Sequence, residues 1–180
     1  MTSGPNSPQR IFEGRRIWCV TAPAFVTAIR LIADAERAFE PDTVVGIRRG
    51  GAPPASALAE LMDVPCAHVA ARHNASDQIA LPATGRVGVD IAGLRRPAGR
   101  VLLVDDICGS GATLDAVGAA LARALDPELV RTATLCRNVG ATTSPDVWVW
   151  DVADWTVFPW EASPSVPVQP LPMPTEVMHP

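Results

Sequence analysis

Short apolar runs alternate along the chain with longer segments in which apolar residues recur every three to four positions. Apolar, β-branched runs are typical of buried strands, and a 3.6-residue period is typical of helices packed along one side. The predicted order is strand 15–20, helix 24–39, strand 43–47, helix 54–62, strand 66–71, strand 100–104, helix 112–124, strand 129–136 and short strands at 147–150 and 155–158. This alternation predicts an α/β fold, a parallel sheet flanked by helices on both faces.

The first predicted helix carries signals at both ends. Thr21 can cap its amino end, and Pro23 suits the first turn. Pro41 is expected to end it, because proline cannot continue a helix. Its apolar positions share one face, which is expected to pack on the sheet.

Three segments do not follow the alternating pattern. Residues 1–14 are polar and rich in Pro and Ser, which predicts a flexible amino-terminal tail. Residues 72–99 mix polar residues with several glycines, which predicts a long mobile loop with a β-arm at 86–91. Residues 162–180 are proline-rich and aperiodic, which predicts a disordered tail.

The composition fits one globular domain, expected over 15–161 with a small β-rich hood from about 137 to 161. Apolar residues make up 48% of the 180 residues, and the net charge is −4. No cationic run or nucleic-acid-binding motif is visible, so no nucleic-acid partner is expected. No stretch has the length and apolarity of a membrane span or a signal peptide, so we expect no membrane association and a cytoplasmic location. The four cysteines are widely spaced, which is typical of free thiols in a reducing compartment.

Two adjacent carboxylates, Asp105 and Asp106, follow the strand predicted in the middle of the sheet. Ligands of parallel sheets bind at the carboxyl ends of strands, so these acids are expected at a binding site. Neighbouring strand residues point to opposite faces, so the two acids can share one orientation only if the chain leaves the strand there.

A turn of small residues and then a helix come directly after the acids. Such a turn lets backbone N–H groups and hydroxyls surround a phosphate at a helix start. The candidate phosphate residues are Gly109, Ser110, Gly111, Ala112 and Thr113. A Walker loop is excluded, since the chain has no lysine, and a dinucleotide fingerprint would need a glycine where Leu114 stands. Carboxylates for ribose hydroxyls and a cradle for a 5′-phosphate together predict a sugar phosphate ligand.

A second loop, Arg48-Arg49-Gly50-Gly51, follows the strand predicted at 43–47. Glycines let the backbone approach a ligand closely, and an arginine offers a forked donor to phosphate oxygens. Taken alone, the same arginine could equally pair with a surface acid.

Segment 101–114 resembles the 5-phosphoribosyl pyrophosphate (PRPP) motif of type I phosphoribosyltransferases, a hydrophobic run followed by two acids and a small-residue loop. Segment 48–51 resembles the pyrophosphate loop of that family, which in the 6-oxopurine branch usually reads Ser-Arg-Gly-Gly; here Arg48 replaces the serine. Segment 154–161 is similar to the ending of the xanthine-guanine phosphoribosyltransferases. The resemblance therefore covers about residues 15–161.

The resemblance implies a Mg²⁺-dependent transfer of the 5-phosphoribosyl group from PRPP to a nucleobase nitrogen, with release of pyrophosphate. It places Asp105 and Asp106 against the ribose hydroxyls and Mg²⁺. The small-residue loop would hold the 5′-phosphate, and the arginine–glycine loop, with Arg49, Gly50 and Gly51 and also Arg48, would hold the pyrophosphate. The loop 72–99 would close over the site.

For the base, the resemblance implies hypoxanthine, guanine or xanthine, and relatives are often dimers or tetramers. Trp155 would stack on the base, with Val157 nearby. Arg137 stands where purine enzymes place a lysine near the exocyclic oxygen of the base. Trp155 could instead be a core residue of the hood.

One position departs from the 6-oxopurine pattern. The first residue of the phosphate loop is usually an acid that meets the purine N7, but this chain has Gly109, which cannot transfer a proton. Two alternatives therefore stay open. One is a phosphoribosyltransferase that acts on a non-purine acceptor, and the other is a regulatory protein that senses PRPP or nucleotides on the same fold.

Overall fold

The computed structural model describes residues 16–72, 87–92, 94, 99–125, 129–162 and 169–177. The predicted amino-terminal tail lies outside these residues, as does most of the predicted loop 72–99.

The described part of the chain forms nine strands and three helices. The strands are β1 (Arg16–Cys19), β2 (Thr43–Arg48), β3 (Cys66–Arg72), β4 (Gly88–Asp90), β5 (Arg100–Cys108), β6 (Leu129–Asn138), β7 (Val147–Val152), β8 (Trp155–Val157) and β9 (Gln169–Pro170). The helices are α1 (Ala22–Ala35), α2 (Ala52–Met62) and α3 (Ala112–Leu125). None of these three helices is long and apolar enough to cross a membrane.

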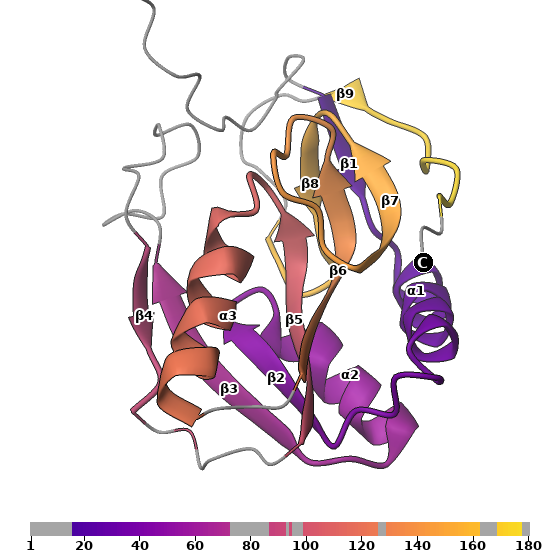
Figure 1. Cartoon of the computed structure of the whole chain (residues 1–180). Coiled ribbons are helices and arrows are strands. Elements are labelled where there is room, and N and C mark those ends of the chain that lie inside the picture. The colour runs from indigo at the N-terminus through magenta and orange to yellow at the C-terminus, as the bar shows by residue number, and fades with distance from the viewer. Residues whose placement is uncertain are drawn as a thin grey trace, which may run out of the picture.

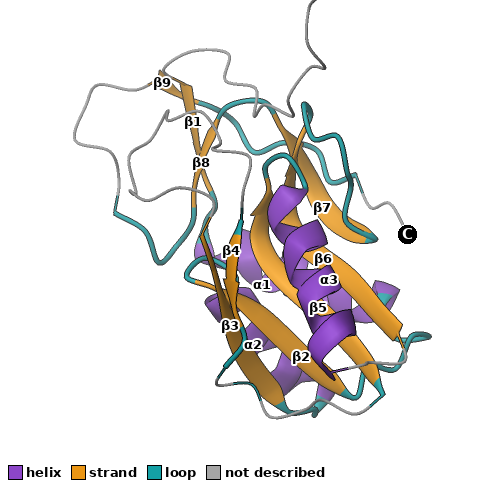
Figure 2. Cartoon of the chain, turned by 60° about the vertical axis from the view of Figure 1, so that its left-hand side comes forward, coloured by secondary structure: helices purple, strands orange, loops and turns teal. Residues whose placement is uncertain are grey.

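Six strands form the main sheet in the order β4-β3-β2-β5-β6-β7 (Figure 1). All neighbouring strands run parallel except β4, which pairs antiparallel with β3 within the predicted β-arm. Helices α1 and α2 cover one face of the sheet and α3 covers the other (Figure 2). The predicted α/β fold with a parallel, helix-flanked sheet is confirmed.

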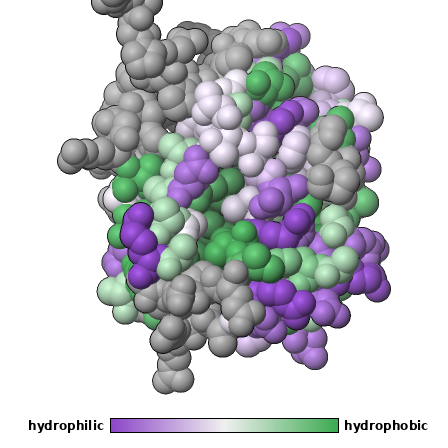
Figure 3. Space-filling view, viewed as in Figure 1, coloured by the Kyte–Doolittle hydropathy of each residue, from purple (hydrophilic) through white to green (hydrophobic). Residues whose placement is uncertain are grey.

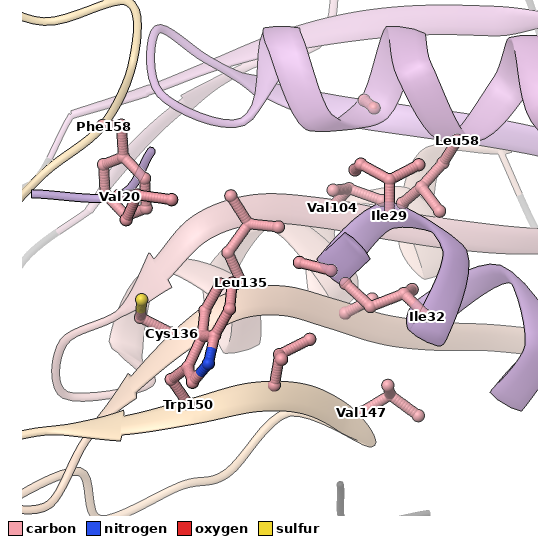
Figure 4. Close-up of a cluster of buried hydrophobic side chains, with 14 of the residues drawn as sticks. Val20, Ile29, Ile32, Leu58, Val104, Leu135, Cys136, Val147, Trp150 and Phe158 are labelled. Atoms are coloured by element: carbon pink, nitrogen blue, oxygen red, sulfur yellow. The ribbon is translucent and has the colours of Figure 1, made fainter. Parts of the chain in front are cut away.

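Strand β5 supplies both hydrophobic cores because its side chains alternate between the two faces. Leu102 and Val104 pack toward α1 and α2, whereas Val101 and Leu103 pack toward α3, and all four are fully buried. In Figure 4, Val104 meets side chains of α1 and α2, including Ile29. Burial of each such aliphatic side chain stabilises the folded state by about 1.5–3 kcal/mol. The middle of the sheet therefore supports the loops that follow its strands.

Helix α1 begins as predicted but ends earlier. The Thr21 hydroxyl accepts the Ala24 N–H at 3.3 Å, which confirms the predicted cap. The helix stops at Ala35, six residues before Pro41, so the prediction that it extends to residue 39 was wrong. The reason is tertiary: the Glu36 side chain turns into the protein, where it is fully buried and paired with Arg131 of β6 at 2.8 Å.

A second, three-stranded parallel sheet, in the order β8-β1-β9, forms the hood. Two expectations about it were wrong. Strand β7, which falls within the predicted hood, belongs to the main sheet, because its residues Val147 and Val149 fill the core shared with α1. Part of the segment expected to be disordered forms β9, and its Leu171 N–H donates to the Ile17 carbonyl at 2.7 Å. Proline is compatible with this pairing because β9 is an edge strand.

None of the four cysteines, all of which lie in the described residues, forms a disulfide. Cys108 and Cys136 are buried, whereas Cys19 and Cys66 are exposed.

Candidate functional site

The two candidate ligand loops lie side by side at the carboxyl edge of the main sheet. Strands β2 and β5 are parallel neighbours, with Gly46 opposite Val104, so the segments that follow them emerge at the same edge (Figure 1). The segment after β2 contains Arg49, Gly50 and Gly51, and its Arg48–Arg49 peptide bond is cis. Both arginines are exposed. The structure thus brings together two motifs that are separated by more than 50 positions in the sequence.

The glycine pair is in direct contact with the acid pair. A Cβ atom built on Gly50 would overlap the Asp106 carboxylate. A Cβ atom on Gly51 would lie 2.8 Å from the Asp105 Cα and 2.7 Å from the Ile47 carbonyl oxygen. The atoms near Gly51 belong to the backbone, so only glycine lets the loop rest on β5 there, whereas a Cβ atom at residue 50 would displace the Asp106 carboxylate.

The acids lie within β5 and not beyond it. Pairing between β5 and β6 continues through Asp105 and Ile107 to Cys108, so the prediction that this strand ends at residue 104 was wrong. The Asp105 side chain instead bends along the strand, and its Oδ1 accepts the Asp106 N–H at 3.0 Å. A carboxylate that turns back onto its own neighbour escapes the strict alternation of strand side chains.

Burial raises the pKa of Asp105 well above the usual aspartate range, and the negative charge of Asp106 raises it further. Backbone N–H groups of Asp106 and Gly51 act in the opposite direction but do not cancel the effect. Two like charges held together in a partly buried site favour a cation or a cationic transition state between or beside them.

The carboxylate oxygens at this edge of the sheet suit a hard cation whose remaining ligands come from water or a substrate. Carboxylate oxygens are the ligands that Mg²⁺ prefers, together with water and substrate phosphates. In the described residues, no three His, Cys, Asp or Glu side chains gather as a complete metal site. Asp105 and Asp106 could therefore hold Mg²⁺ only with further oxygens from water or a substrate.

The candidate phosphate loop follows β5 directly and leads into α3, which begins at Ala112. Gly111 adopts a φ of +95°, a conformation that favours glycine. The Ser110 hydroxyl accepts the Ala112 N–H at 3.3 Å, and the Ser110 carbonyl oxygen accepts the N–H groups of Thr142 and Thr143. The surface over the loops that follow β5 and β6 is pale in Figure 3, which fits their Gly, Ser and Thr content.

Arg137 lies opposite Cys108 in the sheet and is part of a network that the sequence did not reveal. Its guanidinium makes a bidentate ion pair with Asp151, at 2.8 and 3.0 Å, and donates to the Ser144 hydroxyl at 3.0 Å. It also stacks on Trp148, 4.2 Å from the ring centroid, and the Trp148 indole N–H donates to Asp151. The register of β7 against β6 places Asp151 opposite Arg137. That register is not visible in the sequence, so the ion pair could not be predicted.

The hood places the remaining two candidate residues. Trp155 is partly exposed in β8, opposite Ile17, whereas Val157 is buried and its carbonyl oxygen accepts the Val20 N–H at 2.9 Å. The hood lies at the carboxyl end of the main sheet in both ribbon views (Figures 1 and 2). Trp18 and Trp150 pack edge to face, with 5.0 Å between their ring centroids, and both are buried core residues.

The family comparison matches most of the chain. The profile of the phosphoribosyl transferase domain family matches residues 21–166, which include both candidate loops and the hood strand β8. A search of curated proteins found no match.

Solved structures with the same fold include three from different microorganisms. A purine phosphoribosyltransferase from Pyrococcus horikoshii is 26% identical, with a TM-score of 0.70 over 84% of this chain and 98% of that chain. A xanthine-guanine-hypoxanthine phosphoribosyltransferase from Helicobacter pylori is 20% identical, with a TM-score of 0.64 over 81% and 94% of the two chains. A hypothetical protein from Neisseria gonorrhoeae with bound ppGpp is 22% identical, with a TM-score of 0.63 over 83% and 92%. The last two likenesses establish the fold alone.

Proposed function

The chain belongs to the phosphoribosyl transferase domain family and is a PRPP-dependent phosphoribosyltransferase, and from this premise we propose that its acceptor is hypoxanthine, guanine or xanthine. The reaction breaks the bond between C1 of the ribose and the pyrophosphate oxygen and forms a bond from C1 to a base nitrogen. Pyrophosphate leaves, the base nitrogen loses its proton, and the product is a nucleoside 5′-monophosphate.

The observation that carries the proposal is the contact between the glycine pair and the acid pair. Gly50 lies against the Asp106 carboxylate and Gly51 against Asp105, so a pyrophosphate held by the first loop would lie beside a ribose held by the acids. The phosphate loop begins immediately after the same strand. This edge therefore offers donors for a pyrophosphate on one side, acceptors for the two ribose hydroxyls in the middle and donors for a 5′-phosphate on the other side. The groups of PRPP follow one another in the same order.

Each group on this edge has a defined task in the proposed reaction. Asp105 and Asp106 accept hydrogen bonds from the ribose hydroxyls, and their negative charge favours the oxocarbenium-like transition state at C1. Arg49, Gly50 and Gly51, together with Arg48, orient the leaving pyrophosphate. The phosphate loop anchors the 5′ end, so that C1 is held in line between the leaving group and the base.

We propose that Asp105 and Asp106 also hold Mg²⁺, directly or through water. When bound, the ion would neutralise charge on the pyrophosphate and so make it a better leaving group. The raised pKa of Asp105 fits this role, because a dication beside the pair would favour the charged carboxylates that the fold alone disfavours.

For the base, we propose that Trp155 supplies a stacking surface and that Val157 and Arg137 flank it. The partial exposure of Trp155 supports this assignment, because a residue that served only the hood core would be buried like Trp18. The similarity to the Pyrococcus horikoshii purine enzyme supports a purine. We also expect self-association as a dimer or tetramer.

Gly109 favours a second candidate, in which the acceptor is a non-purine base that needs no acid at that position. In either case the proton from the base nitrogen passes to water or to a group other than residue 109, since glycine has no side chain to accept it.

A panel of bases separates these possibilities. Protein, Mg²⁺ and PRPP are incubated with each base, and pyrophosphate release is followed. Turnover with hypoxanthine, guanine or xanthine is the expected result, and turnover with a non-purine alone would transfer the assignment to the second candidate. Binding of PRPP without turnover on any base would instead indicate a regulatory protein, and calorimetry that detected no binding of PRPP would contradict the proposal.

A further inference from the structure

We propose that the turn at residues 141–144, between β6 and β7, is a positioning element that aims the phosphate loop at its ligand. This inference rests on the proposed function, because it assigns the phosphate loop to the 5′-phosphate. The turn contributes no group to the reaction itself. It fixes the direction of one backbone N–H group in the loop.

The first step of the argument is how the turn holds Ser110. The Ser110 carbonyl oxygen accepts three hydrogen bonds: from the Thr142 N–H at 3.2 Å, the Thr143 N–H at 3.4 Å and the Thr142 hydroxyl at 3.1 Å. Three donors on a single carbonyl oxygen fix the plane of the peptide group between Ser110 and Gly111.

The second step follows from the geometry of that peptide group. In a trans peptide, the C=O and the N–H point in opposite directions. Because the Ser110 carbonyl points at the turn, the Gly111 N–H points away from it. Within the described residues, no backbone acceptor is assigned to the Gly111 N–H, although Gly111 is largely buried. A buried donor of this kind normally has a partner, and an anion at the start of α3 would supply one.

The third step is that the turn is itself held in place. The Thr143 hydroxyl donates to Asp115 Oδ2 in the first turn of α3 at 3.0 Å, and the Cys108 thiol donates to the Thr143 carbonyl at 3.3 Å. On its other side, Ser144 accepts a hydrogen bond from Arg137.

Gly111 shows how close the fit is. A Cβ atom at this position would lie 2.6 Å from the Thr143 Cβ and 2.7 Å from the Thr143 carbonyl oxygen. The glycine is therefore needed both for its φ of +95° and for the approach of the turn. The two segments lie against each other although more than 30 residues separate them.

The test is to remove the hydroxyls of the turn and to measure the affinity for each half of PRPP separately. The variant is Thr142→Val with Thr143→Val, and the probes are ribose 5-phosphate and inorganic pyrophosphate, each measured by calorimetry in the presence of Mg²⁺. We expect about tenfold weaker binding of ribose 5-phosphate, which corresponds to about 1.4 kcal/mol. We expect less than a twofold change for pyrophosphate, because its loop lies after β2.

Three controls accompany the variant. Thr142→Ser with Thr143→Ser keeps both hydroxyls and should restore the wild-type affinity for ribose 5-phosphate. Thr27→Val makes the same chemical change on the exposed side of α1, where the hydroxyl donates to the Pro23 carbonyl, and should change neither affinity. Thr143→Val alone keeps the bonds to Ser110 and should have the smaller effect of the two valine variants. Circular dichroism and thermal unfolding confirm that each variant folds.

Folded valine variants that bind ribose 5-phosphate as tightly as the wild type would overturn the positioning role, as would equal losses for both probes. These outcomes would leave the proposed function intact, because the wild-type chain would still bind PRPP. A wild-type chain that binds neither PRPP nor ribose 5-phosphate would overturn the proposed function and this inference with it.

Discussion

The two ends of β5 differ in how charged side chains are arranged: opposite charges are paired at one end, and like charges are adjacent at the other. At its amino end, the Arg100 guanidinium lies 3.1 Å from Glu40 and 3.5 Å from Asp42, so a positive group stands between two negative ones. Near its carboxyl end, Asp105 and Asp106 are adjacent, and burial together with the charge of Asp106 raises the pKa of Asp105. Between these ends, the strand is fully buried and apolar from Val101 to Val104.

The contrast separates structural charge from functional charge. Ion pairs of opposite sign, such as Arg100 with its two acids, are what a protein surface tolerates at little cost. Two acids pressed against a glycine loop weaken the fold, and a cationic ligand or transition state is what such an arrangement can stabilise. A cluster of like charges that opposes folding is therefore a better indicator of a candidate functional site than an ion pair of opposite charges.

The largest expected effect comes from removing the acid pair. Asp105→Asn with Asp106→Asn should lower kcat/KM by about a thousandfold or more, because the transition state loses its electrostatic stabilisation while the fold persists. Steady-state kinetics with PRPP and the preferred base measure the loss. Glu40→Gln with Asp42→Asn, the matching change at the amino end of the strand, should leave kcat/KM within about twofold. A double acid variant with wild-type turnover would remove the distinction between the two ends.

Next in size is the loss of a buried structural ion pair near the amino end of the sheet. Arg131→Ala leaves the fully buried Glu36 carboxylate without its bidentate partner, and we expect about 3 kcal/mol of destabilisation in urea unfolding. Arg131→Ala combined with Glu36→Gln should recover part of this loss, because no charge is then left buried. Activity per folded molecule should not change. A loss of kcat in a fully folded variant would show that charge at this end also serves the reaction.

A smaller effect is expected in the hood. Trp155→Ala should raise the KM for the base about tenfold through lost stacking, while the KM for PRPP changes by less than about twofold. Trp155→Phe keeps an aromatic face and is the matched control. Equal changes in both constants would assign Trp155 to the packing of the hood and not to the base.

The smallest expected effect is a gain in stability. The pKa of Asp105 is raised in the folded state, so the unfolded chain loses this proton more readily and stability falls as pH rises through that range. Asp105→Asn should therefore stabilise the protein by on the order of 1 kcal/mol at neutral pH. The gain should vanish below the ordinary aspartate pKa, where both states of the wild type are protonated. Urea unfolding at several pH values checks this, with Glu60→Gln on the exposed side of α2 as the control.

The local parts of this molecule could be predicted from the sequence. The strand at 100–104 and the cap at Thr21 follow from apolar runs and from cap chemistry, which act between near neighbours. The end of α1 could not be predicted, because its C-cap Glu36 pairs with Arg131, which is 95 residues away in the sequence. The pairing of β7 with the main sheet and of β9 with the hood likewise depends on partners that are distant in the sequence.

The same division holds for the candidate site. The sequence by itself determined which segments are candidates for phosphate binding, because acids, glycines and a helix start must follow one another in a fixed order to provide that chemistry. Only the tertiary structure decided how those groups act together: it set Gly50 against Asp106, turned the Ser110 carbonyl toward Thr142, and joined Arg137 to Asp151. Contacts of this kind depend on strand register and packing, and these are properties of the whole fold that no single segment encodes.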